Sequence, residues 1–120
     1  MAIVNRTPDS FYDRGETAAE EAALARVDEV VAAGAGIVDI GGVKAGIGAE
    51  VTVAEEIARV VPTIAKVRER YPDLHISVDT WRAEVGEAAI KTGANLINDT
   101  WAGHDPELLE VAGAHGVGYV

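Results

Sequence analysis

One repeated unit runs along the sequence: a short apolar run, a polar or glycine-rich turn, a stretch with helical periodicity, a glycine, and the next apolar run. This unit is typical of β-strands that alternate with α-helices in a parallel sheet. The predicted strands are short and mostly apolar, as expected for parallel strands that are covered on both faces. They lie at residues 2–5, 37–40, 76–79, 96–98 and 118–120.

The stretches between these strands carry signals for where helices begin. Thr17 with Glu20, and Thr52 with Glu55, have the spacing of a capping box, in which each side chain bonds the backbone N–H of the other residue. We therefore expect the first helix to start at Thr17 and the second at Thr52. Pro62 has no N–H group and should kink or divide the second helix.

The last two helices have clear signals at both ends. The third is predicted over residues 83–92, before Gly93. The fourth has Asp105 as its cap and Pro106 as its first residue, and it ends at Gly116.

Parallel strands joined by right-handed helical crossovers leave two architectures open, an open doubly wound sheet and a closed eight-stranded barrel. The hydrophobic pattern alone does not separate them. Since an eight-stranded barrel needs about 250 residues, the 120 residues of this chain would supply about half of one.

Charge and composition exclude several classes of function. The net charge is −10, from 20 acidic and 10 basic residues without a basic cluster, which argues against nucleic acid as a partner. No apolar run is long enough to span a membrane, and we expect a cytoplasmic protein. The absence of cysteine excludes disulfides, thiolate zinc sites and a cysteine nucleophile. His75, His104 and His115 do not have the spacing of a metal site.

Polar side chains stand at or near the carboxyl ends of the first four predicted strands. Ligands bind at these ends in both candidate architectures. Any one Asp or Asn could instead serve as a turn or cap residue. Together they suit a ligand with a donor–acceptor edge, such as an aminopyrimidine, and Asp79 and Asn98 are the leading pair. The residues are Asn5, Asp39, Asp79, Asn98 and Asp99.

Two loops extend this region. Residues 7–15 contain two aromatic and several charged side chains, which is consistent with a mobile lid or with an ordinary loop in which Phe11 packs on the rim. Residues 41–48 are rich in glycine, so their amides could approach an anion, but they match neither a P-loop nor a dinucleotide motif. Trp81 and Trp101 could wall the same pocket or pack beside helix starts.

Four sequence blocks carry a resemblance to a known family. The first is Ile-Val-Asn-Arg-Thr-Pro-Asp-Ser-Phe at residues 3–11, followed by Val-Asp-Ile-Gly-Gly at 38–42, Ser-Val-Asp-Thr at 77–80 and Ile-Asn-Asp at 97–99. The first block resembles the N-x-T-P-D-S-F signature of dihydropteroate synthases, and the others follow in that family's order. The resemblance runs from residue 2 to residue 120. It implies a (β/α)8 TIM barrel, of which this chain would form the first four βα units and strand five, a partial pterin-binding domain over residues 1–120.

The resemblance also implies a reaction and a set of roles. The family joins 6-hydroxymethyl-7,8-dihydropterin pyrophosphate to p-aminobenzoate and releases pyrophosphate, a step of folate biosynthesis. Asn5 matches the family's Mg²⁺ ligand. Asp79 and Asn98 match contacts to the pterin edge, with Asp99 beside them. The parent protein is expected to be a homodimer.

The first mobile loop of the family also has matching residues. Asp9 and Asp13 are the catalytic candidates, because a carboxylate there would stabilise positive charge on the pterin methylene as pyrophosphate leaves. The other mobile-loop candidates are Thr7, Pro8, Ser10, Phe11, Gly41 and Gly42.

The sequence departs from the family after Gly42. The family has Glu-Ser-Thr-Arg-Pro-Gly around the p-aminobenzoate end of its site, whereas residues 43–48 here are Val-Lys-Ala-Gly-Ile-Gly. Arg6 replaces a small aliphatic residue and Tyr12 replaces a Ser. These departures favour an alternative, a pterin-binding paralogue that does not transfer to p-aminobenzoate. A third alternative, a methyltetrahydrofolate-binding methyltransferase domain, shares the barrel but lacks the Thr-Pro-Asp-Ser-Phe loop.

The family's later strands supply further pterin and pyrophosphate contacts, which residues 1–120 do not contain. We therefore expect the chain to be part of a longer protein. We also expect these 120 residues by themselves to lack synthase activity.

Overall fold

The computed structural model of the chain describes residues 1–7, 15–44 and 50–120. Within these residues five parallel strands form one sheet in the order β1-β2-β3-β4-β5, and a helix follows each of the first four strands. The strands are β1 (Ala2–Asn5), β2 (Ile37–Gly41), β3 (His75–Asp79), β4 (Leu96–Asn98) and β5 (Gly118–Tyr119). The helices are α1 (Gly15–Ala32), α2 (Val53–Arg70), α3 (Ala83–Thr92) and α4 (Pro106–His115). No helix of the described residues is long and apolar enough to cross a membrane.

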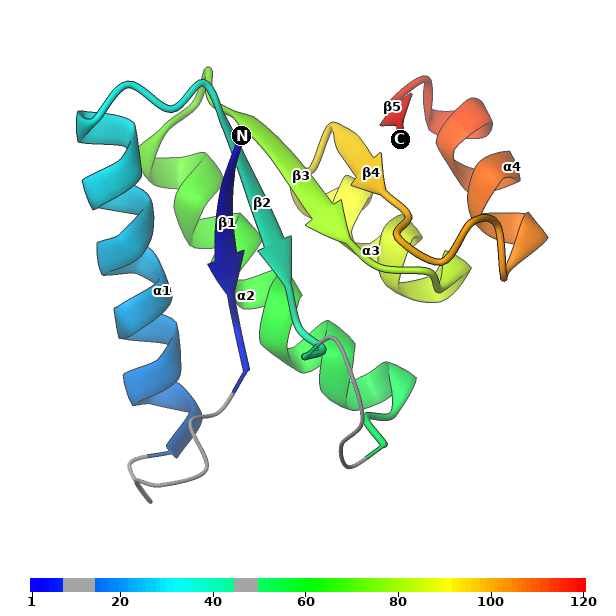
Figure 1. Cartoon of the computed structure of the whole chain (residues 1–120), viewed down its shortest axis with the longest axis horizontal. Helices are drawn as coiled ribbons and strands as arrows, with labels where there is room; N and C mark the ends of the chain where they lie inside the picture. The colour runs from blue at the N-terminus through cyan, green and yellow to red at the C-terminus, as the bar shows by residue number, and fades with distance from the viewer. Residues whose placement is uncertain (8–14, 45–49) are drawn as a thin grey trace.

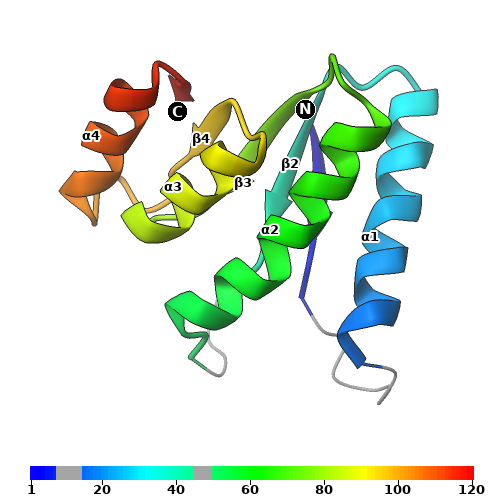
Figure 2. The ribbon, with the colours of Figure 1, turned by 180° about the vertical axis from the view of Figure 1, so that it is seen from behind.

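The described helices cover one face of the sheet. They lie behind the strands in Figure 1 and in front of them in the reverse view of Figure 2. Alternate strand residues point to this face and are fully or almost fully buried against the helices. They are Val4, Val38, Ile40, Ile76, Val78 and Ile97. The described helices therefore supply the cover that was expected on one face of the strands.

The opposite face carries the polar strand residues because side chains alternate along each strand. The strand pairing sets Ile3, Asp39, Ser77 and Leu96 in one row across the sheet. The next row on the same face, at the carboxyl ends, contains Asn5, Gly41, Asp79 and Asn98. Two rows of one face thus bring together residues that are far apart in the sequence.

The capping box of α2 is confirmed. The Thr52 hydroxyl accepts from the Glu55 backbone N–H at 3.2 Å, and the Glu55 carboxylate accepts from the Thr52 N–H at 2.8 Å. In α4, Asp105 caps the helix by accepting from the backbone N–H of Glu107, as expected. The cap predicted at Thr17 is wrong, since α1 already begins at Gly15. Thr17 and the alanines that follow it are compatible with a helix interior, so the helix continues through the capping pattern.

The predicted division of the second helix at Pro62 is also wrong, because α2 is continuous. Close to this proline, the Arg59 carbonyl accepts from the Thr63 hydroxyl at 3.2 Å and from Arg6 Nε at 3.2 Å. Arg6 Nε also lies 3.0 Å from the Thr63 hydroxyl oxygen, and the Arg6 side chain is only 3% exposed. These bonds tie the end of β1 to the middle of α2.

A second arginine holds the end of β2. Arg59 Nη1 of α2 donates to the Gly42 carbonyl at 2.8 Å. A Cβ atom at Gly42 would lie 3.0 Å from Val60 Cγ1 and 3.3 Å from the Glu56 carbonyl oxygen, so any larger residue would have to push α2 away by a few tenths of an ångström. Helix α2 therefore positions the starts of the loops that follow β1 and β2.

Close packing between α3 and α4 yields a stability prediction. A Cβ atom at Gly86 of α3 would lie 2.5 Å from Cδ1 of Leu108, which is fully buried in α4. We expect Gly86→Ala to lower the free energy of unfolding by about 1 kcal/mol, because overpacking costs about 1–3 kcal/mol and exceeds the gain in helix propensity. Urea denaturation would measure the change.

The matched control is Gly113→Ala in α4, where an added Cβ meets no atom within 4 Å. This change should raise the free energy of unfolding by about 0.5–1 kcal/mol. Stabilisation by both substitutions would contradict the packing argument.

Candidate functional site

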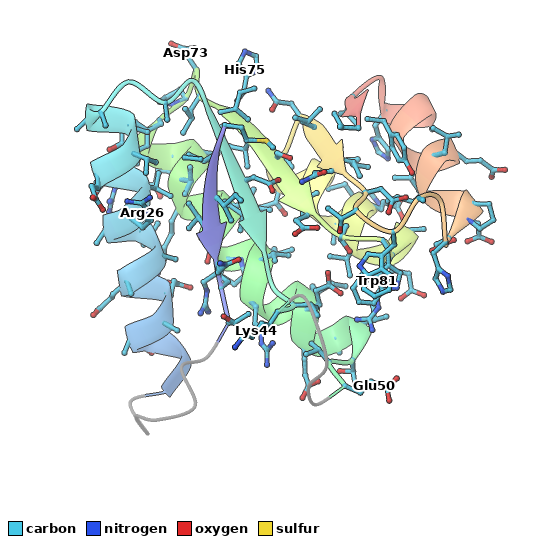
Figure 3. All side chains as sticks on the ribbon, viewed as in Figure 1. Arg26, Lys44, Glu50, Asp73, His75 and Trp81 are labelled. Atoms are coloured by element: carbon cyan, nitrogen blue, oxygen red, sulfur yellow. The ribbon has the colours of Figure 1, made fainter. Side chains whose placement is uncertain are left out.

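Four of the predicted site residues lie side by side at the carboxyl edge of the sheet. The strand register pairs Asn5 with Gly41, Gly41 with Asp79, and Asp79 with Asn98. Asn5 is exposed, whereas Asp79 and Asn98 are half-buried. In Figure 3 Lys44 and Trp81 lie near this edge, and His75 lies at the opposite end of the sheet, as the sequence indicated.

Asp39 lies one row deeper in the same face. Its side chain is 3% exposed, and its Oδ2 atom accepts from Nδ2 of Asn98 at 3.0 Å. Its Oδ1 atom and the Oγ atom of its row neighbour Ser77 are buried without a hydrogen-bond partner among the described residues. The floor beneath the edge residues is therefore polar and incompletely paired, which is typical of a surface that contacts water or a ligand.

Asp79 supplies the carboxyl group of the edge row, and its surroundings alter its pKa. Its Cβ and Oδ2 atoms lie 3.4 Å from the position that a Gly41 Cβ would take, and its Oδ1 atom is 3.4 Å from the Thr100 hydroxyl. Burial, and secondly the nearby charge of Asp39, raise the pKa of Asp79 above its ordinary value of 3.8. A carboxyl group in this state can accept a hydrogen bond or share a proton with a ligand.

Asp99 faces different partners. Its carboxylate accepts from the backbone N–H groups of Trp101 and Gly103, each at 2.9 Å, and from the Tyr119 hydroxyl at 2.6 Å. Burial opposes the charge, but these bonds outweigh it and lower the pKa of Asp99. The bond to Asp99 raises the pKa of Tyr119 to about 12. Asp99 therefore organises the loop between β4 and α4, and its contact with a pterin stays a prediction.

A buried ion pair that sequence reasoning missed lies at the same edge. Arg82 Nη1 donates to Glu56 Oε2 at 2.8 Å, and Arg82 Nη2 donates to the Val51 carbonyl at 2.7 Å. Burial raises the pKa of Glu56, although Thr80 and Arg82 oppose the shift. Glu56 falls on the apolar stripe of α2, with Val60 four residues later, and a charged residue in that stripe was the available signal.

The two tryptophans lie on this ion pair. The Arg82 guanidinium stands 4.5 Å over the Trp81 ring, and the rings of Trp81 and Trp101 are 5.2 Å apart and tilted by 52°. Trp101 is 56% exposed. The tryptophans therefore pack on each other beside the start of α3, which is the structural alternative foreseen for them.

Some predicted site residues lie outside the described residues. Thr7, Gly41 and Gly42 are described, and Thr7 is half-buried. The others of the two loops are not: Pro8, Asp9, Ser10, Phe11, Asp13 and residues 45–48. Their roles stay predictions.

Comparison with known families shows to which family the chain belongs. The family model of pterin-binding enzymes matches residues 1–120. The chain belongs to the pterin-binding enzymes.

Individual members of this family show the same relationship. An inactive dihydropteroate synthase 2 of Mycobacterium leprae is 60% identical over 120 residues, 100% of this chain and 41% of that protein. A dihydropteroate synthase of Bacillus subtilis is 44% identical over 119 residues, 98% of this chain and 41% of that protein. The chain thus spans about two fifths of the length of these curated relatives.

Solved structures place the fold within the family. A dihydropteroate synthase of Xanthomonas albilineans with 4-aminobenzoic acid has 40% sequence identity and a TM-score of 0.87, over 98% of this chain and 43% of that one. The predicted fold is confirmed: the strands and helices of this chain correspond to the N-terminal part of a TIM barrel.

The raised pKa of Asp79 gives this site a characteristic dependence of stability on pH. The stability that comes from its protonated form is present below the unfolded pKa of about 4 and is lost as the pH rises through the higher folded pKa. Asp79→Asn cannot ionise. We therefore expect the free energy of unfolding of the variant, minus that of the wild type, to rise between pH 4 and neutrality in denaturant titrations.

Asp99→Asn is the matched control, because its folded pKa is lowered instead. The stability from ionised Asp99 is present above the unfolded pKa and is lost as the pH falls, so the same difference should decrease with rising pH. If this difference in the free energy of unfolding changed with pH in the same direction for both variants, the electrostatic description of this edge would be refuted.

Proposed function

We propose that the chain forms the pterin-binding part of a dihydropteroate synthase-type transferase, which joins 6-hydroxymethyl-7,8-dihydropterin pyrophosphate to p-aminobenzoate and releases pyrophosphate. The single observation that carries the proposal is the row at the carboxyl edge of the sheet, in which Asn5 of β1, Asp79 of β3 and Asn98 of β4 stand in register, with Gly41 of β2 between Asn5 and Asp79. Relatives with the name dihydropteroate synthase, and the Xanthomonas structure with 4-aminobenzoic acid, support the choice of substrates.

The chemistry of Asp79 and Asn98 suits the ring of a pterin. The pyrimidine edge of a pterin carries an amino group and a ring N–H next to a carbonyl oxygen. A carboxylate can accept from two adjacent N–H groups, and an amide can donate or accept beside it. The half-buried position of both side chains strengthens these bonds by limiting competition from water.

The donor set at the end of β1 fits Mg²⁺. Asn5 is exposed, and its side-chain amide makes no hydrogen bond within the described residues. No group of three or more His, Cys, Asp or Glu in residues 1–7, 15–44 and 50–120 could hold a metal ion. Mg²⁺ keeps several waters and takes few protein ligands together with phosphate oxygens, so the amide oxygen of Asn5 would be a sufficient ligand from this strand. Bound Mg²⁺ would neutralise the charge of the leaving pyrophosphate.

The remaining parts of the proposal concern the loops and the whole protein. Asp9 and Asp13 are proposed to stabilise the positive charge that develops on the pterin methylene. Arg6 and Arg59 fix the strand ends from which the two loops start. A cytoplasmic location and a homodimeric parent protein are further parts of the proposal.

A second candidate function is pterin binding without transfer to p-aminobenzoate. Two observations favour it. Residues 43–48 lack the hydroxyl, Glu, Arg and Pro side chains that the resemblance leads one to expect there. The relatives named inactive dihydropteroate synthase 2 are 58–60% identical to this chain, whereas the Bacillus synthase is 44% identical.

One assay separates the two candidates. The full-length protein is given 6-hydroxymethyl-7,8-dihydropterin pyrophosphate and Mg²⁺, and pyrophosphate release is measured with and without p-aminobenzoate. The transferase predicts release that depends on p-aminobenzoate. Ligand-dependent thermal stabilisation without any release would exclude the transferase and leave the binding protein. An absence of both would exclude a pterin function.

The role of Asn5 can be tested separately. We expect Asn5→Ala to weaken binding of the pterin pyrophosphate by at least about tenfold in the presence of Mg²⁺, a typical loss for a perturbed metal site. Binding of 6-hydroxymethylpterin, which has no pyrophosphate, should not change. Isothermal titration calorimetry gives both values, and an equal loss for the two ligands would show that Asn5 acts on the ring or on the fold.

A further inference from the structure

We propose that Asp39 is a positioning residue, which holds the Asn98 amide in one of its two orientations and so makes the site select rings with an amino group over rings with an oxo group. The inference rests on the proposed pterin function and names what selects the ligand. It starts from the contact between Asp39 Oδ2 and Asn98 Nδ2 at 3.0 Å.

The chemistry of this contact allows only one orientation. An Asn side chain has a donor end and an acceptor end, and a rotation of about 180° exchanges them. A carboxylate only accepts hydrogen bonds, so it selects the nitrogen end of the amide. Asn98 Oδ1 lies on the other side of the amide carbon, is therefore directed away from Asp39, and has no partner within the described residues.

The position of Asp39 makes this selection firm. Its side chain is 3% exposed in the middle of β2, where the backbone pairs with β1 on one side and β3 on the other. Asn98 is at the edge of the sheet above it and is half-buried. Asp39, which sets the orientation, is thus held by the sheet. Asn98, whose orientation is set, lies where a ligand can reach it.

A fixed acceptor at Asn98 has a consequence for ligand choice. A ring amino group can donate to Oδ1, whereas an oxo group in the same place would put two acceptors against each other. Leaving a buried polar group unpaired costs about 1–3 kcal/mol, which corresponds to a preference of roughly 10–100-fold. Without Asp39, the amide could turn over, present Nδ2 to an oxo group and remove most of that preference.

The test compares two rings that differ at C2, where one has an amino group beside an unprotonated N1 and the other has an oxo group beside an N1–H. Dissociation constants of 6-hydroxymethylpterin, which is 2-amino, and 6-hydroxymethyllumazine, which is 2-oxo, are measured for the full-length protein by calorimetry. We expect the wild type to prefer the pterin by roughly 10–100-fold. We expect Asp39→Asn to reduce this ratio by about fivefold or more, because an amide of equal size can pair with either end of Asn98, whereas the preference that comes from the Asp79 carboxylate remains.

The control is Asp28→Asn in α1. Asp28 accepts from Arg70 and Tyr71 on the outer side of the molecule, so the same chemical change should leave the ratio as in the wild type. If Asp39→Asn weakens both rings by one factor and keeps the ratio, Asp39 supports the fold only and the proposal is overturned.

A second measurement needs no ligand. In ¹⁵N-labelled protein, the side-chain NH₂ signals of Asn98, assigned by their loss in Asn98→Ala, should exchange slowly with water in the wild type and quickly in Asp39→Asn. Equal exchange in both proteins overturns the positioning role. If neither ring binds the wild type while the exchange rates differ as expected, the proposed pterin function fails and the positioning of Asn98 stands.

Discussion

The parallel register of the first four strands is the constraint on which the site depends. It aligns Asn5, Gly41, Asp79 and Asn98 without offset, so that residues from four separate segments, three of them with polar side chains, share one edge. A shift of one residue in any pair would turn a polar side chain into the helix-facing core, where the neighbours are fully buried Val and Ile. The apolar core on one face thus specifies the polar site on the other.

Two carboxyl groups of like charge lie in the site, and contacts with α2 hold the surrounding strand ends in place. Asp39 and Asp79 stand close together in a chain of net charge −10, and burial adds to their mutual repulsion. Three contacts of α2 hold the edge in place against this repulsion: Arg6 on Thr63, Arg59 on the Gly42 carbonyl, and Glu56 on Arg82. A site with like charges is less stable than a neutral one, and such a cost is usual where a ligand must be bound.

Local patterns in the sequence were enough to predict the elements and much of the site. Strand boundaries were right to within one residue, and the caps of α2 and α4 were confirmed, since neighbouring residues decide both. The cap at Thr17 failed because a helix can pass through a capping pattern. The contacts of Asn98 with Asp39 and of Arg82 with Glu56 were missed, because they join residues 59 and 26 positions apart and only the folded sheet brings them together.

The anchoring of Gly42 separates the strand end from the loop that follows it. Substitutions can accumulate at different rates in these two parts of the sequence. Arg59 holds the Gly42 carbonyl, a backbone group that every residue possesses, and the close approach of Val60 favours glycine there. Because the strand end is held at Gly42, we expect substitutions beyond it to disturb Asp39 and Asp79 little. During evolution, the loop that begins at Val43 could therefore change to suit another substrate. Asp79 and Asn98, which would contact the ring, and Asp39 beneath them would stay in place.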